Sequence, residues 1–230
     1  MTTNFKTLKT VPKESKYVEH KLKHCQQCYN WDCGIACTMM LLSLEQRENM
    51  RENFWKICQD EGFEQSTWTI DLCYLLVRFG IEHCMYTTIK GVSNTQASCD
   101  KLDYKTRKRV ERRFQNADEA GILIYIQELG SEKLLSHIET RGPAIVLVDA
   151  ALLVCDLCKH NKLRAEFRRA FGGPYRGHYV VVVGYAGGKI LYRDPALSPR
   201  LCATSPGRLH NARRSPGTDF DAILIFKDFR

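Results

Sequence analysis

The sequence lacks long apolar runs. No segment approaches the roughly 20 consecutive apolar residues of a membrane-spanning helix. The N-terminal stretch MTTNFKTLKTVPKESKYVEHKLKH is polar and basic, without the apolar core of a secretory signal peptide. Internal repeats and low-complexity segments are also missing. We therefore expect a soluble protein of the cytosol or nucleus, with no membrane span.

Two features of nucleotide sites are missing as well. The sequence has no glycine-rich loop of the P-loop kind, and its nearest match, GYAGGK at 184–189, is more typical of a hairpin turn. It also has no acidic pair at a predicted strand end that is set for two metal ions. The sequence alone therefore disfavours two-metal nucleotide chemistry.

The bulk composition is that of one well-packed domain. The 230 residues are 44% hydrophobic and 26% charged, which is enough material for a sizeable core. The net charge of +8 comes largely from the clusters KTRKRVERR (105–113), RAEFRR (164–169) and ARR (212–214). Such clusters suit acidic partners, but they more often form a solvated face. We expect no specific binding of nucleic acid.

Cysteine, by contrast, is abundant. The chain has 11 cysteines, an odd number, and without secretion they are expected to be reduced thiols. Cys25 and Cys28 form one CxxC pair, and Cys155 and Cys158 form another. Two such pairs are the pattern of a structural zinc site, although their long separation is unlike a zinc ribbon. A redox pair and ordinary reduced cysteines are the alternatives.

The order of local patterns predicts an α+β fold, with an N-terminal helical lobe packed on an antiparallel sheet. Residues 1–23 are expected to form a flexible or loosely docked arm, and residues 24–230 a single domain. The predicted helices are one that begins after Asp32, one within 43–62, and those at 66–80, 107–119 and 131–142. The predicted strands and apolar runs are 83–89, 121–126, 143–150, 178–185, 189–194 and 221–226.

The stretch QCYNWDCGIAC (27–37) places Cys33 at the expected start of a helix. The free N–H groups and dipole of a helix N-terminus favour an anion there, in this case a thiolate. Asp32 is expected to cap the helix, and Gly34 to let a substrate backbone approach the sulfur. Trp31 is expected to form a wall of the same cleft. Taken alone, Cys33 also fits a buried core thiol.

A nucleophilic thiolate needs an imidazole, and the imidazole needs an orienting group. His178 opens the strand HYVVVVGY, and Asp194 ends the next strand. A three-residue turn at 186–188 pairs Tyr185 with Lys189 and puts the two side chains on one face, with Cβ atoms roughly 7–8 Å apart. A two-residue turn without a bulge would separate them. Gly177, in the glycine-rich approach GGPYRGH (172–178), is a further candidate cleft residue.

Gln27 is the expected fourth part of the site. Acyl transfer builds negative charge on a carbonyl oxygen, which a side-chain amide and a backbone N–H can stabilise together. Gln27 lies on the loop that leads into the helix, and its amide is expected to fold back toward the sulfur. With the Cys33 N–H it would form an oxyanion hole. Gln26 is the neighbouring alternative.

These residues resemble known families. Gln27, six positions before Cys33 in the segment DCGIAC, followed by HYVVVVGY and DP, are similar to the catalytic segments of papain-like bacteriocin-processing peptidases. WDCGIAC, STWTIDLCYL, AIVLVDA, CDLC, GHYVVVVGY and the late GTD more closely resemble the guanylyl (guanylate) cyclase domain-containing family over most of the chain. The first resemblance implies a papain-like fold with a Cys33–His178–Asp194 triad and Gln27 at the oxyanion hole. The second implies production of cyclic GMP from GTP.

We expect a papain-like cysteine hydrolase of peptidase or isopeptidase type, acting on a protein or peptide substrate without a cofactor. Guanylyl cyclase activity is the alternative, and it would need Mg²⁺ or Mn²⁺. A catalytically silent regulatory or interaction protein that keeps the papain-like frame is a further alternative.

Overall fold

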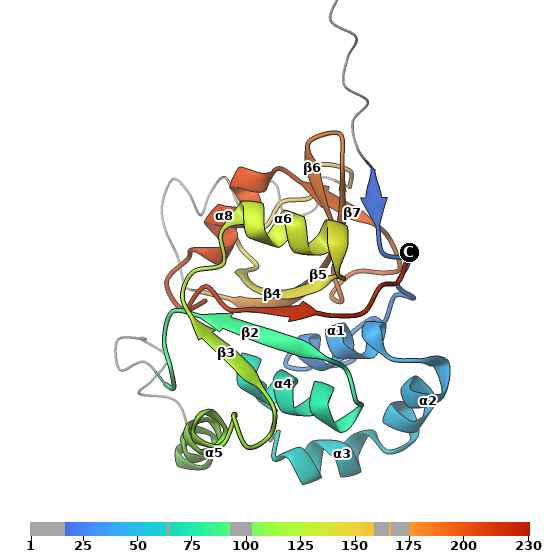
Figure 1. The fold of residues 1–230 in the computed structure, drawn as a ribbon. Helices are drawn as coiled ribbons and strands as arrows, with labels where there is room; N and C mark the ends of the chain where they lie inside the picture. Colours follow the sequence, from blue (N-terminus) through green and yellow to red (C-terminus); the bar gives the residue numbers. More distant parts are fainter. Residues whose placement is uncertain (1–16, 64, 93–102, 159–165, 167–174) are drawn as a thin grey trace, which may run out of the picture.

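The computed structural model describes residues 17–63, 65–92, 103–158, 166 and 175–230 (Figure 1). Its helices are α1 (Cys33–Leu41), α2 (Leu44–Glu52), α3 (Phe54–Glu61), α4 (Thr69–Arg78), α5 (Tyr104–Gln115), α6 (Ser131–Thr140) and α8 (Pro206–Arg213). Its strands are β1 (Val18–Glu19), β2 (His83–Thr87), β3 (Leu123–Ile126), β4 (Ala144–Asp149), β5 (Gly177–Ala186), β6 (Lys189–Arg193), β7 (Cys202–Thr204) and β8 (Ala222–Ile225). The expected α+β class is confirmed.

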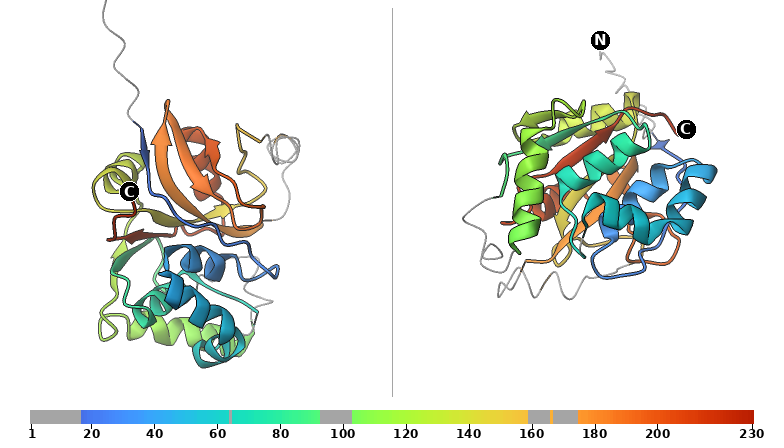
Figure 2. Two further views of the ribbon diagram at one scale, coloured as in Figure 1. Left: turned by 90° about the vertical axis from the view of Figure 1, so that its right-hand side faces the viewer. Right: turned by 90° about the horizontal axis from the view of Figure 1, so that it is seen from below.

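All the described strands join one sheet, in the order β3-β2-β8-β4-β5-β6-β7, with β1 added alongside β5. Helices α1 to α5 lie on one face of the sheet, and α6 and α8 on the other (Figures 1 and 2). The expectation of an antiparallel sheet is wrong at one edge, because β3 pairs with β2 in parallel. The chain reaches β3 by a crossover through α5, and such crossovers join parallel strands.

Strand β5, next to the middle strand of the sheet, is buried on both faces. Val181 and Val183 belong to the core beneath α1 and α4, while Val180 and Val182 belong to the core beneath α6. A strand covered on both faces is expected to be continuously apolar rather than alternating. This explains the run VVVV, and the catalytic candidate His178 lies near the start of this buried strand.

Helix α1 is the element that brings Cys33 to the sheet. All nine of its residues are buried, between β5 and α4. Residues 43–62, predicted to form a loop and one helix, instead form two helices, α2 and α3, divided at Asn53. Short elements without a strong apolar period, β7 and α8, were not predicted.

Residues 17–23, expected to be part of a loosely docked arm, pack against the sheet. Val18 and Glu19 form β1 and pair with Tyr185 and Gly184 of β5. His20 is fully buried, and its Nε2 lies 2.8 Å from the carbonyl oxygen of Ile138 in α6. Residues 17–23 therefore belong to the sheet and its core; residues 1–16 lie outside the described part.

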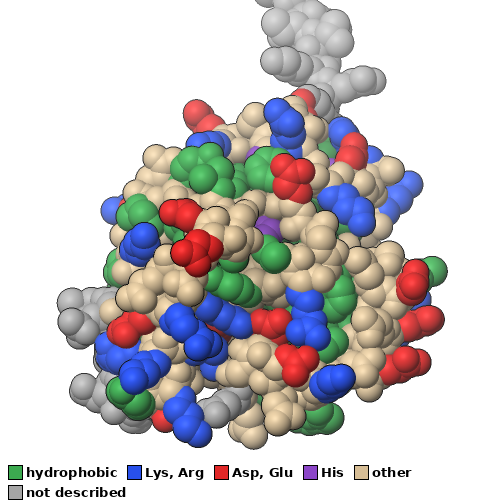
Figure 3. All heavy atoms as spheres, turned by 60° about the horizontal axis from the view of Figure 1, so that its bottom comes forward, with side chains coloured by type: hydrophobic (Ala, Val, Ile, Leu, Met, Phe, Trp, Pro, Cys, Tyr) green, Lys and Arg blue, Asp and Glu red, His purple; other side chains and the backbone are tan. Residues whose placement is uncertain are grey.

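The basic cluster 105–113 forms most of α5. Figure 3 shows Lys and Arg side chains gathered on this side of the molecule, and Lys105, Lys108 and Arg112 are exposed. Arg109 and Arg113, on the inner face, are buried against α4. The cluster thus packs against α4 on one face and is exposed to solvent on the other.

Among the described helices, none combines the length and apolar character needed to cross a membrane.

Candidate active site

Cys33 is the first residue of α1 and is buried. Asp32 precedes it, but its carboxylate makes no capping bond to the helix. Oδ2 and Oδ1 instead accept hydrogen bonds, each 3.0 Å long, from the backbone N–H groups of Cys28 and Tyr29. The expectation that Asp32 caps the helix is therefore wrong. Its carboxylate closes the loop that precedes α1.

His178 and Asp194 lie side by side and both are buried. His178 Nε2 is 2.7 Å from Asp194 Oδ1, and that oxygen also accepts a 3.0 Å bond from the Ala196 N–H. With Nε2 held by the carboxylate, Nδ1 is the ring nitrogen left for the Cys33 thiol. An imidazole that a carboxylate orients in this way is what a thiol nucleophile requires.

The pKa of His178 reports both contacts. Burial lowers this pKa, but hydrogen bonds to Asp194 and to Cys33, and the charges of both groups, overcome that effect and raise it to about 10. An imidazole with that pKa is protonated at pH 7. The geometry therefore favours an imidazolium beside Cys33, the state that stabilises a thiolate.

The turn of the β5–β6 hairpin differs from the predicted one, although His178 and Asp194 still lie on one face. The turn has two residues, Gly187 and Gly188, and Ala186 pairs with Lys189, so the predicted pairing of Tyr185 with Lys189 is wrong. Both turn glycines have positive φ, as a two-residue hairpin turn requires. The register then shifts between Val182 and Gly184. This bulge restores the one-residue offset and returns His178 and Asp194 to the same face.

Gln27 lies close to the site but its amide is occupied. Its Nε2 donates a 2.6 Å hydrogen bond to the carbonyl oxygen of Tyr29, while Oε1 is buried without a partner in the described structure. Its backbone N–H donates to the carbonyl oxygen of Pro195, beside Asp194. The loop is thus anchored at the triad candidates. The predicted fold-back of the amide toward the sulfur is not the conformation observed.

A pocket of about 250 Å³ opens beside Cys33. Two of the predicted cleft residues, Trp31 and Gly177, line it; Asp32 and Gly34 do not. Sequence reasoning missed most of the polar lining, which comes from four separate segments. The polar side chains of this lining include Asn30, Gln65, Ser66, Thr67, Thr69, Tyr175, Tyr179, Asp219 and Asp221.

Gly34 has a packing role instead of the expected substrate role. A Cβ added there would lie 2.7 Å from Leu72 Cδ1 of α4 and 3.1 Å from Tyr179 Cδ2 of β5. Real Cβ contacts essentially never reach the shorter distance. The glycine lets α1 approach α4 and β5 closely, and this approach positions Cys33.

Two carboxylates give the pocket its charge. Asp221 is buried, and its Oδ1 has no hydrogen-bond partner in the described structure. Burial raises the pKa of Asp221 to about 7, against hydrogen bonds from Thr69 and Thr87, and Asp219 adds to the shift. No lysine or arginine occurs among the described residues that line this pocket. The sequence pointed to these two carboxylates only through the GTD segment, which ends at Asp219.

The two CxxC pairs do not meet. Cys202 instead lies beside Cys155 and Cys158. Among the described residues, these three cysteines form the only group of three or more potential metal ligands whose donor atoms lie close enough to share one ion. Cys25 and Cys28 are therefore not part of that cluster. Cys25 is buried near Met39, and Cys28 is exposed.

Comparisons with known proteins place the chain in a family. Guanylyl cyclase 1 of Arabidopsis thaliana is 33% identical over 211 residues, which cover 88% of this chain and 74% of that protein. A crystal structure of a C39-like peptidase from Bacillus anthracis aligns with 94% of this chain and 100% of its own, at 13% identity and a TM-score of 0.42. That likeness is too loose to assign an activity. The family model described as guanylylate cyclase matches residues 22–225, and the chain therefore belongs to this family.

Proposed function

We propose that this protein is a papain-like cysteine hydrolase in which Cys33, His178 and Asp194 form a catalytic triad. The observation that carries the proposal is the 2.7 Å contact between His178 Nε2 and Asp194 Oδ1, on an imidazole that also interacts with Cys33. A carboxylate-oriented imidazole beside a thiol at a helix N-terminus is suited to nucleophilic catalysis. The bond attacked is a peptide or isopeptide amide in a protein or peptide.

The chemistry follows from these positions. His178 holds the proton of the Cys33 thiol, and the thiolate adds to the carbonyl carbon of the substrate. The imidazolium gives its proton to the departing amine as the C–N bond breaks, which leaves a thioester on Cys33. His178 then takes a proton from water, whose oxygen attacks the thioester. The acid product leaves, and the proton returns to the Cys33–His178 pair.

The oxyanion of both steps needs donors at the start of α1. The Cys33 N–H lies in the first turn, where backbone amides have no intrahelical acceptor. Gln27 becomes the second donor if its Nε2 exchanges the Tyr29 carbonyl oxygen for the oxyanion. Removing one oxyanion donor typically costs about 10²–10³ in rate. Asn30, which lines the same pocket, is the alternative donor to compare.

Guanylyl cyclase activity is the second candidate, supported by the family model and by the name of the Arabidopsis relative. A divalent cation would neutralise the GTP triphosphate and favour attack at its α-phosphate. Asp219 and Asp221 fit such a cation in charge and ligand type, and the unpartnered Asp221 Oδ1 is a free donor. The lining offers no described lysine or arginine for the triphosphate itself. Hydrolase chemistry fits the pocket better for this reason.

The deciding experiment measures alkylation of each cysteine by iodoacetamide between pH 5 and 9, by peptide mass spectrometry. An exposed thiol with an ordinary pKa near 8.5 is less than about 1% ionised at pH 6. We expect Cys33 to react at pH 6 at least roughly tenfold faster than exposed Cys28, and His178→Ala and Asp194→Asn to slow it. Cys37, buried one turn later, is the internal control for unfolding.

A Cys33 that reacts like Cys28 would overturn the hydrolase proposal and leave a silent scaffold or a cyclase. The cyclase candidate is assayed separately, by cyclic GMP formation from GTP with Mg²⁺ or Mn²⁺. Cyclase activity that survives Cys33→Ala and is lost in Asp221→Asn would favour the second candidate.

A further inference from the structure

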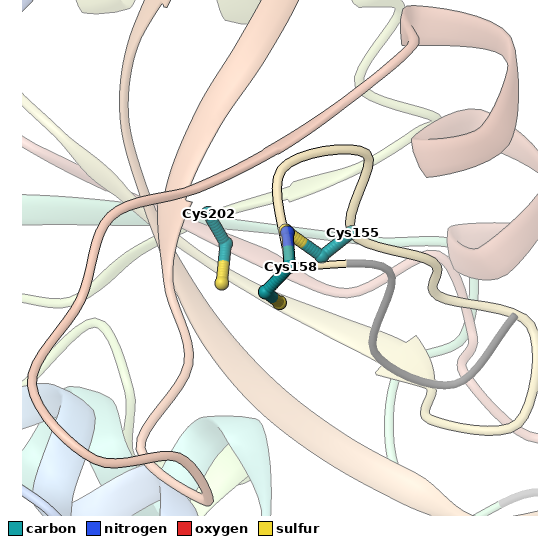
Figure 4. A group of neighbouring side chains, drawn as sticks. All are labelled: Cys155, Cys158 and Cys202. Carbon is teal, nitrogen blue, oxygen red and sulfur yellow. The ribbon is translucent and has the colours of Figure 1, made fainter.

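Three cysteines gather at the edge of the sheet, away from the Cys33 pocket. Cys155 and Cys158 lie on the loop after β4, and Cys202 is the first residue of β7 (Figure 4). Their Sγ atoms all lie within 4.8 Å of one another. Figure 4 shows the three side chains turned toward a common point. The sulfur atoms thus come from two segments that the fold brings together.

The backbone holds the CxxC turn in place. The Cys158 N–H lies 3.4 Å from Cys155 Sγ, so a sulfur atom accepts a backbone hydrogen bond within the turn. The Asp156 N–H donates a 2.7 Å bond to the carbonyl oxygen of Ala203, the residue after Cys202. The Asp156 carboxylate is paired with Lys189 and Arg208. The position of the two cysteines relative to Cys202 is therefore fixed without any bond between sulfurs.

We propose that Cys155, Cys158 and Cys202 bind one zinc ion. Thiolates around tetrahedral zinc, with Zn–S bonds of about 2.3 Å, lie about 3.8 Å apart, so the observed cluster needs only a small contraction. Cys155 and Cys202 are buried while Cys158 is exposed, which leaves the solvent side for a fourth ligand such as water. Three thiolates select a soft or borderline metal over Mg²⁺ or Ca²⁺.

The role of the ion follows from the segments it joins. It would link the loop after β4 to β7, on the same sheet whose strand β5 carries His178. Cys33 and the pocket residues take no part in the cluster. The ion would therefore tie these two segments together, and it acts independently of the proposed hydrolase. The alternative function is a redox disulfide between Cys155 and Cys158, which would not involve Cys202.

The test is the metal content of the full-length protein, purified under reducing conditions without chelator, by inductively coupled plasma mass spectrometry. We expect about one zinc per chain. Cys158→Ser and Cys202→Ser should each lower the zinc content at least severalfold. Cys28→Ser, an exposed cysteine of the other CxxC pair, is the matched control and should keep the metal.

A second measurement covers variants that fail to fold. The wild-type protein, stripped of metal and titrated with Co²⁺ under reducing conditions, should gain thiolate-to-cobalt charge-transfer absorption and the intense visible bands of a tetrahedral site. Zinc should displace these bands. Protein that carries no zinc and takes up no Co²⁺ overturns the proposal, as does a Cys155–Cys158 disulfide that persists in reducing buffer. Zinc retained by Cys202→Ser with its wild-type stoichiometry also overturns the proposed ligand set.

Discussion

At the scale of single residues, Asp221 is the carboxyl group whose ionisation the fold opposes most clearly. Its folded-state pKa of about 7 exceeds the unfolded value, because burial disfavours the charged form. Between these two values the folded chain holds a proton that the unfolded chain has lost. The contribution of this proton to the free energy of unfolding is therefore complete below about pH 3.9 and is lost as the pH rises through 7.

Asp221→Asn should remove this pH dependence. Each tenfold change in proton affinity corresponds to about 1.4 kcal/mol. The free energy of unfolding of the variant, relative to that of wild type, should therefore be higher at pH 8 than at pH 4 by on the order of 2–4 kcal/mol. Urea unfolding at several pH values measures this difference. Asp219→Asn, which removes a neighbouring charge that adds to the shift of Asp221, should make the pH dependence smaller without abolishing it. A difference between Asp221→Asn and wild type that stays constant with pH would contradict the assignment.

At the scale of elements, one carboxylate joins two helices. Asp71 of α4 is fully buried and accepts hydrogen bonds from Arg109 and Arg113 of α5, with distances of 2.7–3.2 Å. Its Oδ2 also accepts a 2.9 Å bond from the Trp68 N–H at the start of α4. The acidic residue in the apolar WTIDL segment is thus the counter-ion of the inner face of α5.

Asp71→Asn should destabilise the protein strongly. The substitution removes the carboxylate that pairs with buried Arg109 and one of the two that pair with buried Arg113, the other being that of Glu61. Breaking a buried pair in this way costs roughly 3–5 kcal/mol. Asp60→Asn is the matched control, because it removes the surface pair with Arg78, whose side chains are 43% and 38% exposed. Exposed pairs contribute about 0–1 kcal/mol. Chemical denaturation measures both, and equal losses would contradict the proposed role of Asp71.

At the scale of the whole molecule, the N-terminal segment closes the sheet against the C-terminal half. The His20 N–H donates a 2.8 Å hydrogen bond to the Val183 carbonyl oxygen, at the bulge in β5. Val18 and Leu22 are buried in the two separate cores on opposite faces of the sheet. Gly184 permits the close approach, since a Cβ there would collide with the Val18 carbonyl group.

A chain that begins at His24 should therefore be less stable than one that begins at Tyr17. Losing the burial of two aliphatic side chains costs about 1.5–3 kcal/mol each, which lowers the melting temperature of a protein of this size by on the order of 10 °C. Differential scanning calorimetry of the two chains gives the comparison. Equal melting temperatures would show that residues 17–23 are the loosely docked arm expected from the sequence.

Most of the elements and the identity of the triad candidates could be predicted from local patterns in the sequence. Periodicity, capping and glycine stops are local signals, and they placed the major helices and the strands of the central sheet. Cys33, His178 and Asp194 could be chosen because their residue types and order suit a thiol nucleophile. Local signals are weak in short elements, so β1, β7 and α8 were missed.

Which of these side chains meet could not be predicted, because it depends on how distant segments pair in the folded chain. The bulge after Val182 depends on pairing along the whole of β5, and a local turn rule gave the wrong loop length. Cys202 joins Cys155 and Cys158 through sheet pairing, not through sequence spacing. The Asp32 and Gln27 side chains take backbone partners in the loop at Cys28 and Tyr29. Contacts between distant segments set the strand register, the packing distances and the choice of hydrogen-bond partners. Local sequence patterns do not reveal such contacts.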